Sequence, residues 1–235
     1  MRPPRPSLQR LDALGVVVGL AFALALVAGP ARAVPASEPG DMALGNPKAQ
    51  VTVIEYASVG CPHCAMWNNQ IFPTIRAQYV ATGKARLVVR EMLYGDGGVA
   101  AAGFMLARCA GPAKYFPMID AIYHRQESLF QDGAQQQAIL RDIAKTTGGL
   151  SDAAFDACLA DKQALADVNA RSDHHQSADN IVETPTFFLN GQRLASELAP
   201  GDLARATHTS GTAHSGAAHP GAARAGPARA ADHRR

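Results

Sequence analysis

The sequence predicts an α/β protein whose strands fall into two groups, separated by a long and mainly helical region. Apolar, largely β-branched residues at 51–56 predict a buried strand, and a helical stretch then leads to a second strand at 85–92. Helical spacing dominates from about 98 to 177, and a strand returns at 186–189, where Asn190-Gly191 predicts a tight hairpin turn. The strand–helix–strand order of the first group implies a parallel pair joined by a right-handed crossover.

Residues 1–33 have the pattern of a secretory signal. Three arginines within the first ten residues precede an apolar run from 13 to 28, and Ala31-Arg32-Ala33 places small residues where a signal peptidase reads them. The alternative is an uncleaved membrane anchor, but the run is shorter than the ~18 apolar residues expected of a spanning helix. We therefore expect cleavage, export and a periplasmic location, in an oxidising compartment where disulfides persist.

The first half of the α/β unit is expected over residues 34–95. Residues 34–50 are rich in Pro, Gly and Ala and predict no regular element before the first strand. A helix is expected to begin at Cys61-Pro62, because proline suits a first helical turn, and to run toward Tyr79 with a kink at Pro73.

Residues 96–178 are expected to form an inserted helical domain, and residues 179–206 the second half of the α/β unit. Helical spacing predicts helices over these segments: 99–109, 113–129, 135–147, 151–160, 162–176 and the start of a closing helix at 200–206. From 207 to 235 the chain has no large apolar residue to bury, so we expect a disordered tail. The tail histidines are too loosely spaced to predict more than weak metal binding.

The charge distribution argues against a nucleic-acid-binding role. The formal net charge is +2, but residues 1–33 and 207–235 together hold eight of the 22 basic residues and two of the 20 acidic ones. The middle of the chain is therefore net acidic and lacks the basic surface that nucleic-acid binding requires.

Cys61 and Cys64 form a Cys-Pro-His-Cys motif at the predicted junction between strand and helix. Cys61 lies where unpaired backbone N–H groups and the helix dipole favour negative charge, and His63, when protonated, adds a second stabilising charge. Thiols in such settings have pKa values lowered from ~8.5 to roughly 3.5–7.5. A stable thiolate makes the corresponding disulfide more oxidising. Cys64, one turn further along the helix, should be less exposed and less acidic.

Other uses of a Cys-x-x-Cys motif fit this sequence less well. Half of a zinc site would need a second close ligand pair, whereas Cys109 and Cys158 are single and far apart in the sequence. A c-type haem site would need histidine after the second cysteine, where the chain has Ala65. A purely structural disulfide would close too short a loop to stabilise the fold much. The strand–loop–helix context favours redox chemistry.

Two segments resemble the DsbA-like thiol–disulfide oxidoreductases. The first runs from Leu44-Gly45-Asn46-Pro47 through the strand at 51–56 to Gly60-Cys61-Pro62-His63-Cys64, and the second is Thr184-Pro185-Thr186-Phe187-Phe188-Leu189-Asn190-Gly191. The resemblance spans about residues 43–206. It implies a thioredoxin-like α/β fold with an inserted all-helical domain.

The resemblance also assigns roles to residues outside the cysteine motif. It implies that Pro185 is a cis-proline beside the cysteines and that the Thr184 backbone pairs with an extended substrate peptide. An ordinary trans proline at the start of an edge strand is the alternative. Glu55 matches the family's buried acid, and either a proton-relay role for Cys64 or a structural role satisfied by a partner fits its place in an apolar strand.

The implied activity is disulfide introduction into unfolded exported proteins that carry free thiols. No cofactor is expected because the dithiol carries the electrons, and a DsbB-like membrane quinone reductase would reoxidise the enzyme, which we expect to be a monomer. His63 and the lack of a separate dimerisation domain favour an oxidase over a reductase or isomerase of the same fold. A periplasmic metal-binding or metallochaperone protein that uses Cys61, His63 and Cys64 is the non-enzymatic alternative.

Cys109 and Cys158 lie on apolar helical stripes within the predicted insertion. Each follows apolar residues one helical turn earlier, so both are expected to face the core of the insertion. Export and the even cysteine count favour a second, structural disulfide between them. Two free buried cysteines that act as small apolar residues are the alternative.

Overall fold

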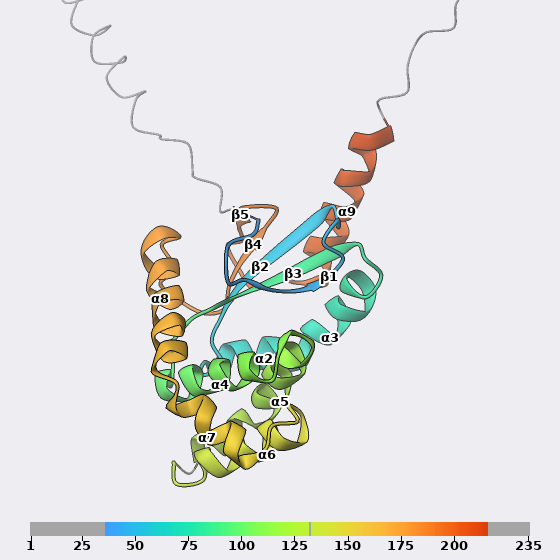
Figure 1. Cartoon of the computed structure of the whole chain (residues 1–235). Helices are drawn as coiled ribbons and strands as arrows, with labels where there is room; N and C mark the ends of the chain where they lie inside the picture. Colours follow the sequence, from blue (N-terminus) through green and yellow to red (C-terminus); the bar gives the residue numbers. More distant parts are fainter. Residues whose placement is uncertain (1–35, 132, 216–235) are drawn as a thin grey trace, which may run out of the picture. The chain divides into compact units, whose positions relative to one another are not determined.

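The fold is built on a five-stranded sheet. The computed structural model describes residues 36–131 and 133–215. The strand order is β1-β3-β2-β4-β5, so the two groups of strands predicted from the sequence share one sheet (Figure 1). The strands are β1 (Met42–Gly45), β2 (Val51–Ala57), β3 (Ala85–Glu91), β4 (Thr186–Leu189) and β5 (Gln192–Arg193).

The register of the sheet places the two sequence motifs side by side. β2 and β3 run parallel, as predicted, and β4 runs antiparallel to β2 with Tyr56 opposite Thr186. Alternation along β2 directs Val53 and Ala57 into the main core, which also includes the helices, and Tyr56 into a smaller core on the other face. Glu55 shares the parity of Val53, so it faces the helices and the cysteines.

β1 was not predicted from the sequence. It lies in the segment at 34–50 for which no regular element was expected, and it pairs antiparallel with β3, with Ala43 opposite Val88. The strand has four residues at the edge of the sheet and is only partly buried, so it lacks the apolar run that marks a buried strand. Its conformation depends on the ladder to β3, which local sequence does not reveal.

The helix that follows the cysteines breaks earlier than predicted. α2 (Pro62–Gln70) is followed by α3 (Phe72–Ile75) and a π-helical turn, η2 (Arg76–Val80), with the break at Ile71. Pro73 lacks an N–H and its ring crowds the preceding turn, so it is accommodated in the first turn of a new helix rather than at a kink.

The helical insertion covers one face of the sheet. Its helices are α4 (Gly97–Cys109), α5 (Pro112–Gln131), α6 (Gln136–Thr146), α7 (Asp152–Ala160) and α8 (Lys162–Ala178), close to the segments that helical spacing predicted. Figure 1 shows α2 and α4 beneath the sheet and α5, α6 and α7 beyond them. Among the described residues, no helix combines the length and apolar character needed to cross a membrane.

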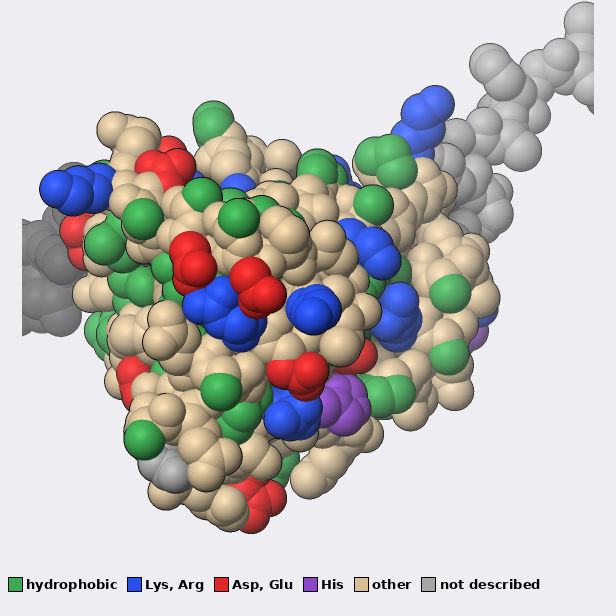
Figure 2. Space-filling model, turned by 60° about the horizontal axis from the view of Figure 1, so that its bottom comes forward, with side chains coloured by type: hydrophobic (Ala, Val, Ile, Leu, Met, Phe, Trp, Pro, Cys, Tyr) green, Lys and Arg blue, Asp and Glu red, His purple; other side chains and the backbone are tan. Residues whose placement is uncertain are grey.

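The surface formed by the insertion carries mixed charge. On the face in Figure 2, acidic and basic side chains lie next to one another without a broad area of one sign. Ion pairs between helices contribute to this pattern: Arg125 pairs with Asp142, and Arg141 pairs with Asp152 and Asp156.

The closing helix extends further than predicted. α9 runs from Pro200 to Ser215, whereas a disordered tail was expected from residue 207. Leu203 is fully buried and holds the helix against the sheet, and the Thr207 hydroxyl donates to the Leu203 carbonyl one turn earlier. Residues 208–215 hold one alanine among Thr, Ser, His and Gly, which are weaker helix formers, so the sequence carries no signal for this extension. The signal segment at 1–33 and the tail beyond Ser215 lie outside the described residues.

A buried carboxylate links β3 to the insertion. Glu91 is almost completely buried and forms ion pairs with Arg108 of α4 at 2.7 Å and Arg171 of α8 at 2.8 Å. The Tyr115 hydroxyl of α5 donates to the same carboxylate at 3.1 Å. Because three helices satisfy one buried charge, the insertion is held in a defined position on the sheet.

A disulfide joins Cys109, at the end of α4, to Cys158 of α7, with their Cα atoms 6.4 Å apart. The bond closes a loop between residues 49 positions apart in the sequence. It lies within the insertion and contributes no group to the cysteine pair at Cys61.

Replacement of both residues, Cys109→Ala with Cys158→Ala, should lower the free energy of unfolding by up to about 4 kcal/mol, the chain-entropy contribution for a loop of this length. Urea unfolding of the oxidised proteins measures the difference. Full reduction of both proteins, which also opens Cys61–Cys64 in each, should make their stabilities equal. Equal stability of the two oxidised proteins would contradict a structural role for the bond.

Candidate active site

Cys61 occupies the N-terminal end of α2. It is the N-cap residue, with an extended backbone (φ −104°, ψ 122°), and Pro62 begins the helix as expected. The N–H groups of the first turn have no partner within the helix, and the helix dipole adds positive potential there. Cys61 is 9% exposed, which leaves its sulfur near the surface at a position that stabilises negative charge.

Cys64 lies one turn further along and is fully buried. Burial raises the pKa of its thiol well above the ordinary value, and its hydrogen bond to Cys61 and the charge of Glu55 raise it further. Both cysteines are thiols in the structure. The motif therefore combines a slightly exposed Cys61 with a fully buried Cys64 that retains its proton, as the sequence predicted.

The pKa of Cys61 is lowered from 9.0 to about 5. The hydrogen bond from the Cys64 side chain is the largest cause, and it outweighs the opposing effect of burial. The Thr184 hydroxyl and the backbone N–H groups of Cys64 and His63 also stabilise the thiolate. A pair of sulfurs that share one proton in this way is ready for thiol–disulfide exchange at neutral pH.

His63 contributes to this thiolate through its backbone. Its side chain is exposed, and the stabilising contact that the structure resolves is the His63 N–H rather than the imidazole. Stabilisation of the Cys61 thiolate by a protonated His63 imidazole, which the sequence led us to expect, thus stays a prediction.

The second motif lies directly against the first. The Thr184–Pro185 peptide bond is cis, and the Cys61 thiol donates a hydrogen bond of 3.2 Å to the Thr184 carbonyl oxygen. The Thr184 hydroxyl is buried and faces the Cys61 sulfur, and it has no other hydrogen-bond partner among the described residues. A groove of about 220 Å³ runs past these residues and is lined by His63, Glu183, Thr184, Pro185, Thr186, Phe187 and 193–197.

Two glycines hold the loop that carries Cys61. The Asp96 N–H donates to the Gly60 carbonyl at 3.1 Å, so the loop before Cys61 touches the loop before α4 by its main chain. A Cβ at Gly60 would collide with the Asp96 carbonyl, and one at Gly95, where φ is +72°, would collide with the Gly60 carbonyl. Glycine is therefore required at both positions.

Glu55 lies behind the cysteines on β2. It is 4% exposed, and its Oε1 atom has no hydrogen-bond partner among the described residues. Burial raises the pKa of Glu55 from 4.5 to about 8, so the carboxyl is largely protonated at neutral pH. Its electrostatic effect on Cys64 shows that the two groups are close enough to influence each other's ionisation.

Two residues of α5 were missed by sequence reasoning. The Gln126 amide donates to the carbonyls of Val59 at 2.8 Å and Cys61 at 3.1 Å, which fixes the cysteine loop from the side of the insertion. The Tyr123 hydroxyl is buried without a hydrogen-bond partner among the described residues. Burial raises its pKa well above the ordinary value, and the charges of Cys64 and Glu55 raise it further. A glutamine on the apolar stripe of α5 was the signal that was available.

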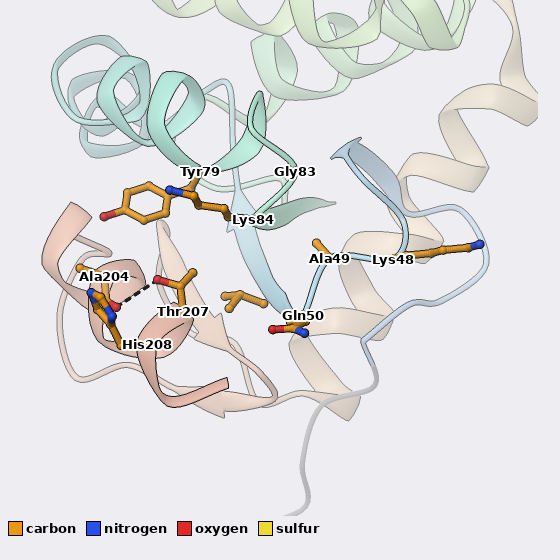
Figure 3. Close-up of a pocket in the computed structure, with 10 residues that line it drawn as sticks. Lys48, Ala49, Gln50, Tyr79, Gly83, Lys84, Ala204, Thr207 and His208 are labelled. Carbon is orange, nitrogen blue, oxygen red and sulfur yellow. Dashed lines mark hydrogen bonds between the residues drawn. The ribbon is translucent and has the colours of Figure 1, made fainter. Parts of the chain in front are cut away.

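Another pocket lies away from the cysteines. Figure 3 shows a pocket of about 450 Å³ between the start of β2, the turn after η2 and α9, with Tyr79, Lys84 and His208 among its lining residues. The Thr207 hydroxyl and the Ala204 carbonyl form a hydrogen bond within α9 at its edge. None of its lining residues belongs to the Cys61–Cys64 motif or to the segment around Pro185.

Comparison with known proteins was consistent with this geometry. The model of the family described as thioredoxin matches residues 37–207. A Rickettsia conorii protein named as a protein-disulfide oxidoreductase is 35% identical over 151 residues, which are 64% of this chain and 53% of that protein. Disulfide bond formation protein D of Bacillus subtilis is 29% identical over 158 residues, 64% of this chain and 68% of that protein. The chain thus spans about half the length of the Rickettsia relatives.

Solved structures share the fold. The α-DsbA1 of Wolbachia pipientis superposes with a TM-score of 0.65 at 24% identity, over 77% of this chain and 96% of that one. Oxidised BdbD of Bacillus subtilis gives a TM-score of 0.62 at 22% identity, over 75% and 94%. These matches confirm the predicted α/β fold with its helical insertion.

Removal of the Cys64 thiol should raise the pKa of Cys61, because the largest stabilising hydrogen bond is lost. We expect Cys64→Ala to raise it by roughly one to three units, and Cys64→Ser, which keeps a donor, to raise it less. Titration of the thiolate absorbance measures both. Identical pKa values in the two variants would mean that the donated hydrogen bond does not stabilise the thiolate.

Glu55 should make the oxidised protein less stable as pH rises. The pKa of Glu55 in the folded protein, about 8, exceeds its ordinary value of 4.5. Its contribution to the free energy of unfolding is therefore fully present below pH 4.5 and is lost as the pH rises through 8. The loss is up to about 1.4 kcal/mol per pH unit. Glu55→Gln should therefore match the wild-type stability below pH 4.5 and exceed it near pH 8.

Urea unfolding of the oxidised proteins at both ends of this range is the appropriate measurement, because a disulfide removes the titration of Cys61. The exposed Glu127→Gln variant provides the control and should show no such gain. Equal stability of wild type and Glu55→Gln near pH 8 would argue that the carboxyl ionises normally.

Proposed function

We propose, from the premise that this chain belongs to the thioredoxin family and has the fold of the DsbA proteins, that it is an exported enzyme that introduces disulfides into other proteins. The observation that carries the proposal is the unequal pair at the start of α2. Cys61 has a pKa lowered to about 5, and Cys64 is buried with a raised pKa. Relatives named for disulfide oxidation and disulfide bond formation support the same chemistry.

The reaction begins with a disulfide between Cys61 and Cys64. A substrate thiolate attacks the Cys61 sulfur, because that sulfur is the more exposed of the two. The Cys61–Cys64 bond breaks, a substrate–Cys61 bond forms, and Cys64 leaves as a thiolate. A second substrate thiolate then attacks the substrate sulfur of the mixed disulfide and releases Cys61 as a thiolate. The substrate loses two electrons, and the enzyme gains them.

Proton transfer follows from the unequal pKa values. The buried Cys64 thiolate takes up a proton because its thiol pKa is well raised, and the protonated Glu55 carboxyl behind it is a local donor. Cys61 leaves without needing a proton, since its thiolate is stable at neutral pH. Glu55 then recovers its proton from solvent. Of the two protons that the substrate thiols lose, one is thus balanced by the Cys64 thiol and the other passes to water.

The substrate chain would lie in the groove beside Pro185. The groove is open along Thr184 and the segment after β5, and its wall reaches the exposed His63. An extended peptide there would bring a cysteine thiol to the Cys61 sulfur. This sulfur contacts the carbonyl of Thr184, one of the residues that line the groove. Unfolded exported proteins with free thiols are the substrates we propose.

The direction of the reaction follows from thiolate stabilisation. A protein that stabilises its reduced form gives up its disulfide readily, so it acts as an oxidant of other dithiols. Each cycle leaves the enzyme reduced, and a DsbB-like quinone reductase in the membrane is the reoxidant we propose. Action in the periplasm agrees with the signal pattern at 1–33 and with the Cys109–Cys158 disulfide, a bond typical of oxidising compartments.

Cys61→Ser should abolish oxidation of a reduced two-cysteine peptide, because no electrophilic sulfur remains for substrate attack. Cys64→Ser cannot form the internal disulfide and should also fail to oxidise the reduced peptide. Given the oxidised, disulfide-bonded peptide, its Cys61 thiolate should attack the peptide disulfide and accumulate the mixed disulfide, because no Cys64 thiol remains to release Cys61. Peptide oxidation and mass spectrometry of the products provide the measurement. The Cys109→Ala, Cys158→Ala variant is the matched control and should retain activity. Residual activity in Cys61→Ser would refute the proposal.

The same site predicts an oxidising reduction potential. Equilibration with glutathione buffers, followed by the fluorescence of the single tryptophan, Trp67, gives the value. We expect a potential above about −200 mV, whereas a value near −270 mV would place the protein among reductants. The latter outcome would favour the reductase alternative.

A further inference from the structure

A second polar cluster lies on the face of the sheet that turns away from the cysteines. Arg90 of β3 projects there beside Tyr56, and its side chain is fully buried. It forms ion pairs with Glu38 at 3.4 Å, Asp41 at 3.2 Å and Asp179 at 3.4 Å. Three carboxylates from two distant segments thus surround one guanidinium.

Two histidines at the end of α8 complete the cluster. His174 Nε2 lies 3.5 Å and His175 Nδ1 3.9 Å from the same Glu38 oxygen, Oε2. The three atoms lie within 4.8 Å of one another. These separations are too long for good hydrogen bonds. They are close to the spacing of about 3.3–3.6 Å between neighbouring donors around a tetrahedral cation with bonds of 2.0–2.2 Å.

His175 provides an independent indication of a ligand. The residue is 4% exposed, and its Nδ1 atom is buried without a hydrogen-bond partner among the described residues. A buried ring nitrogen without a partner is unfavourable and calls for an explanation. Asp179 Oδ2 is the nearest acidic atom on its own helix end, at 3.6 Å. A cation between the nitrogen and Glu38 would satisfy this atom.

The charge of the cluster suits a divalent cation. Glu38, Asp41 and Asp179 are acidic, and Arg90 is the basic group that the structure places among them. The guanidinium contacts Oε1 of Glu38, which leaves Oε2 facing the histidines. Arg90 therefore orients the carboxylate as an outer-shell partner does in known metal sites, and the sum of charges is negative.

We propose that Glu38, His174 and His175 form a binding site for a divalent transition-metal ion of the zinc type. Two imidazole nitrogens and one carboxylate oxygen suit zinc, whereas calcium and magnesium prefer oxygen ligands throughout. The His174 side chain is 56% exposed, which leaves a solvent-facing position for a water ligand and a path for entry.

The bound metal would hold two distant segments of the chain together. Glu38 precedes β1, the histidines end α8, and Asp179 begins the segment that leads to Thr184 and Pro185. The metal takes no part in the thiol reaction, because its site lies on the other face of the sheet. Its expected effect is stabilisation of the fold, through binding to the folded state alone.

Zinc binding to the oxidised full-length chain tests the proposal. Oxidation ties up Cys61 and Cys64, whose thiolates would otherwise bind zinc, and the tail histidines are present in every variant. We expect one tight zinc ion per wild-type chain and a rise in the melting temperature. His174→Ala should weaken this binding at least ~10-fold and abolish the rise. The control, His124→Ala, removes an exposed histidine that also neighbours a carboxylate and should bind as wild type does.

Two further measurements complete the test. Glu38→Gln keeps the shape of the side chain and should weaken zinc binding as His174→Ala does. Cobalt should give the absorption bands of a four-coordinate ion in the wild type and not in His174→Ala. Unchanged zinc affinity in both variants, or an equal rise in melting temperature with calcium, would overturn the proposal. Loss of tight binding in His124→Ala would overturn it as well.

Discussion

The hydrogen bond between the Cys64 thiol and the Cys61 sulfur keeps the two cysteines in unequal protonation states. It depends on the complete burial of Cys64, which retains the proton, and on the position of Cys61 at the start of α2, which favours the thiolate. Most of the surrounding structure serves these two conditions. The sheet provides Glu55 behind the pair, and the cis bond at Pro185 places Thr184 beside it.

The helical insertion is part of the active site as well as its cover. Gln126 reaches from α5 to the carbonyls of the cysteine loop, and Tyr123 places a buried hydroxyl near Glu55 and Cys64. Glu91 fixes the insertion to β3 through charged partners on α4 and α8. A shift of the insertion would therefore alter the polarity around the buried thiol and with it the balance between the two sulfurs.

Much of the fold was predictable because its signals are local. The apolar run of β2, the Asn190-Gly191 turn and the helical spacing of the insertion each lie within one element. The short edge strand β1 and the interaction of Gln126 with the cysteine loop depend on partners far along the chain, so the sequence did not reveal them. The cluster of Glu38 with His174 and His175 was missed for the same reason, because more than 130 positions separate its parts.

Main-chain contact between Gly60 and Gly95 has a consequence for how such proteins diversify. The position of the Cys61 sulfur is set by main-chain contacts at Gly60 and Gly95 that leave no room for a side chain. A substitution at either glycine would therefore move the Cys61 sulfur. Pro62 and His63, which separate the cysteines, are exposed to solvent. Related proteins can thus vary this dipeptide and change the reduction potential of the disulfide. The direction from which a substrate sulfur approaches Cys61 stays the same.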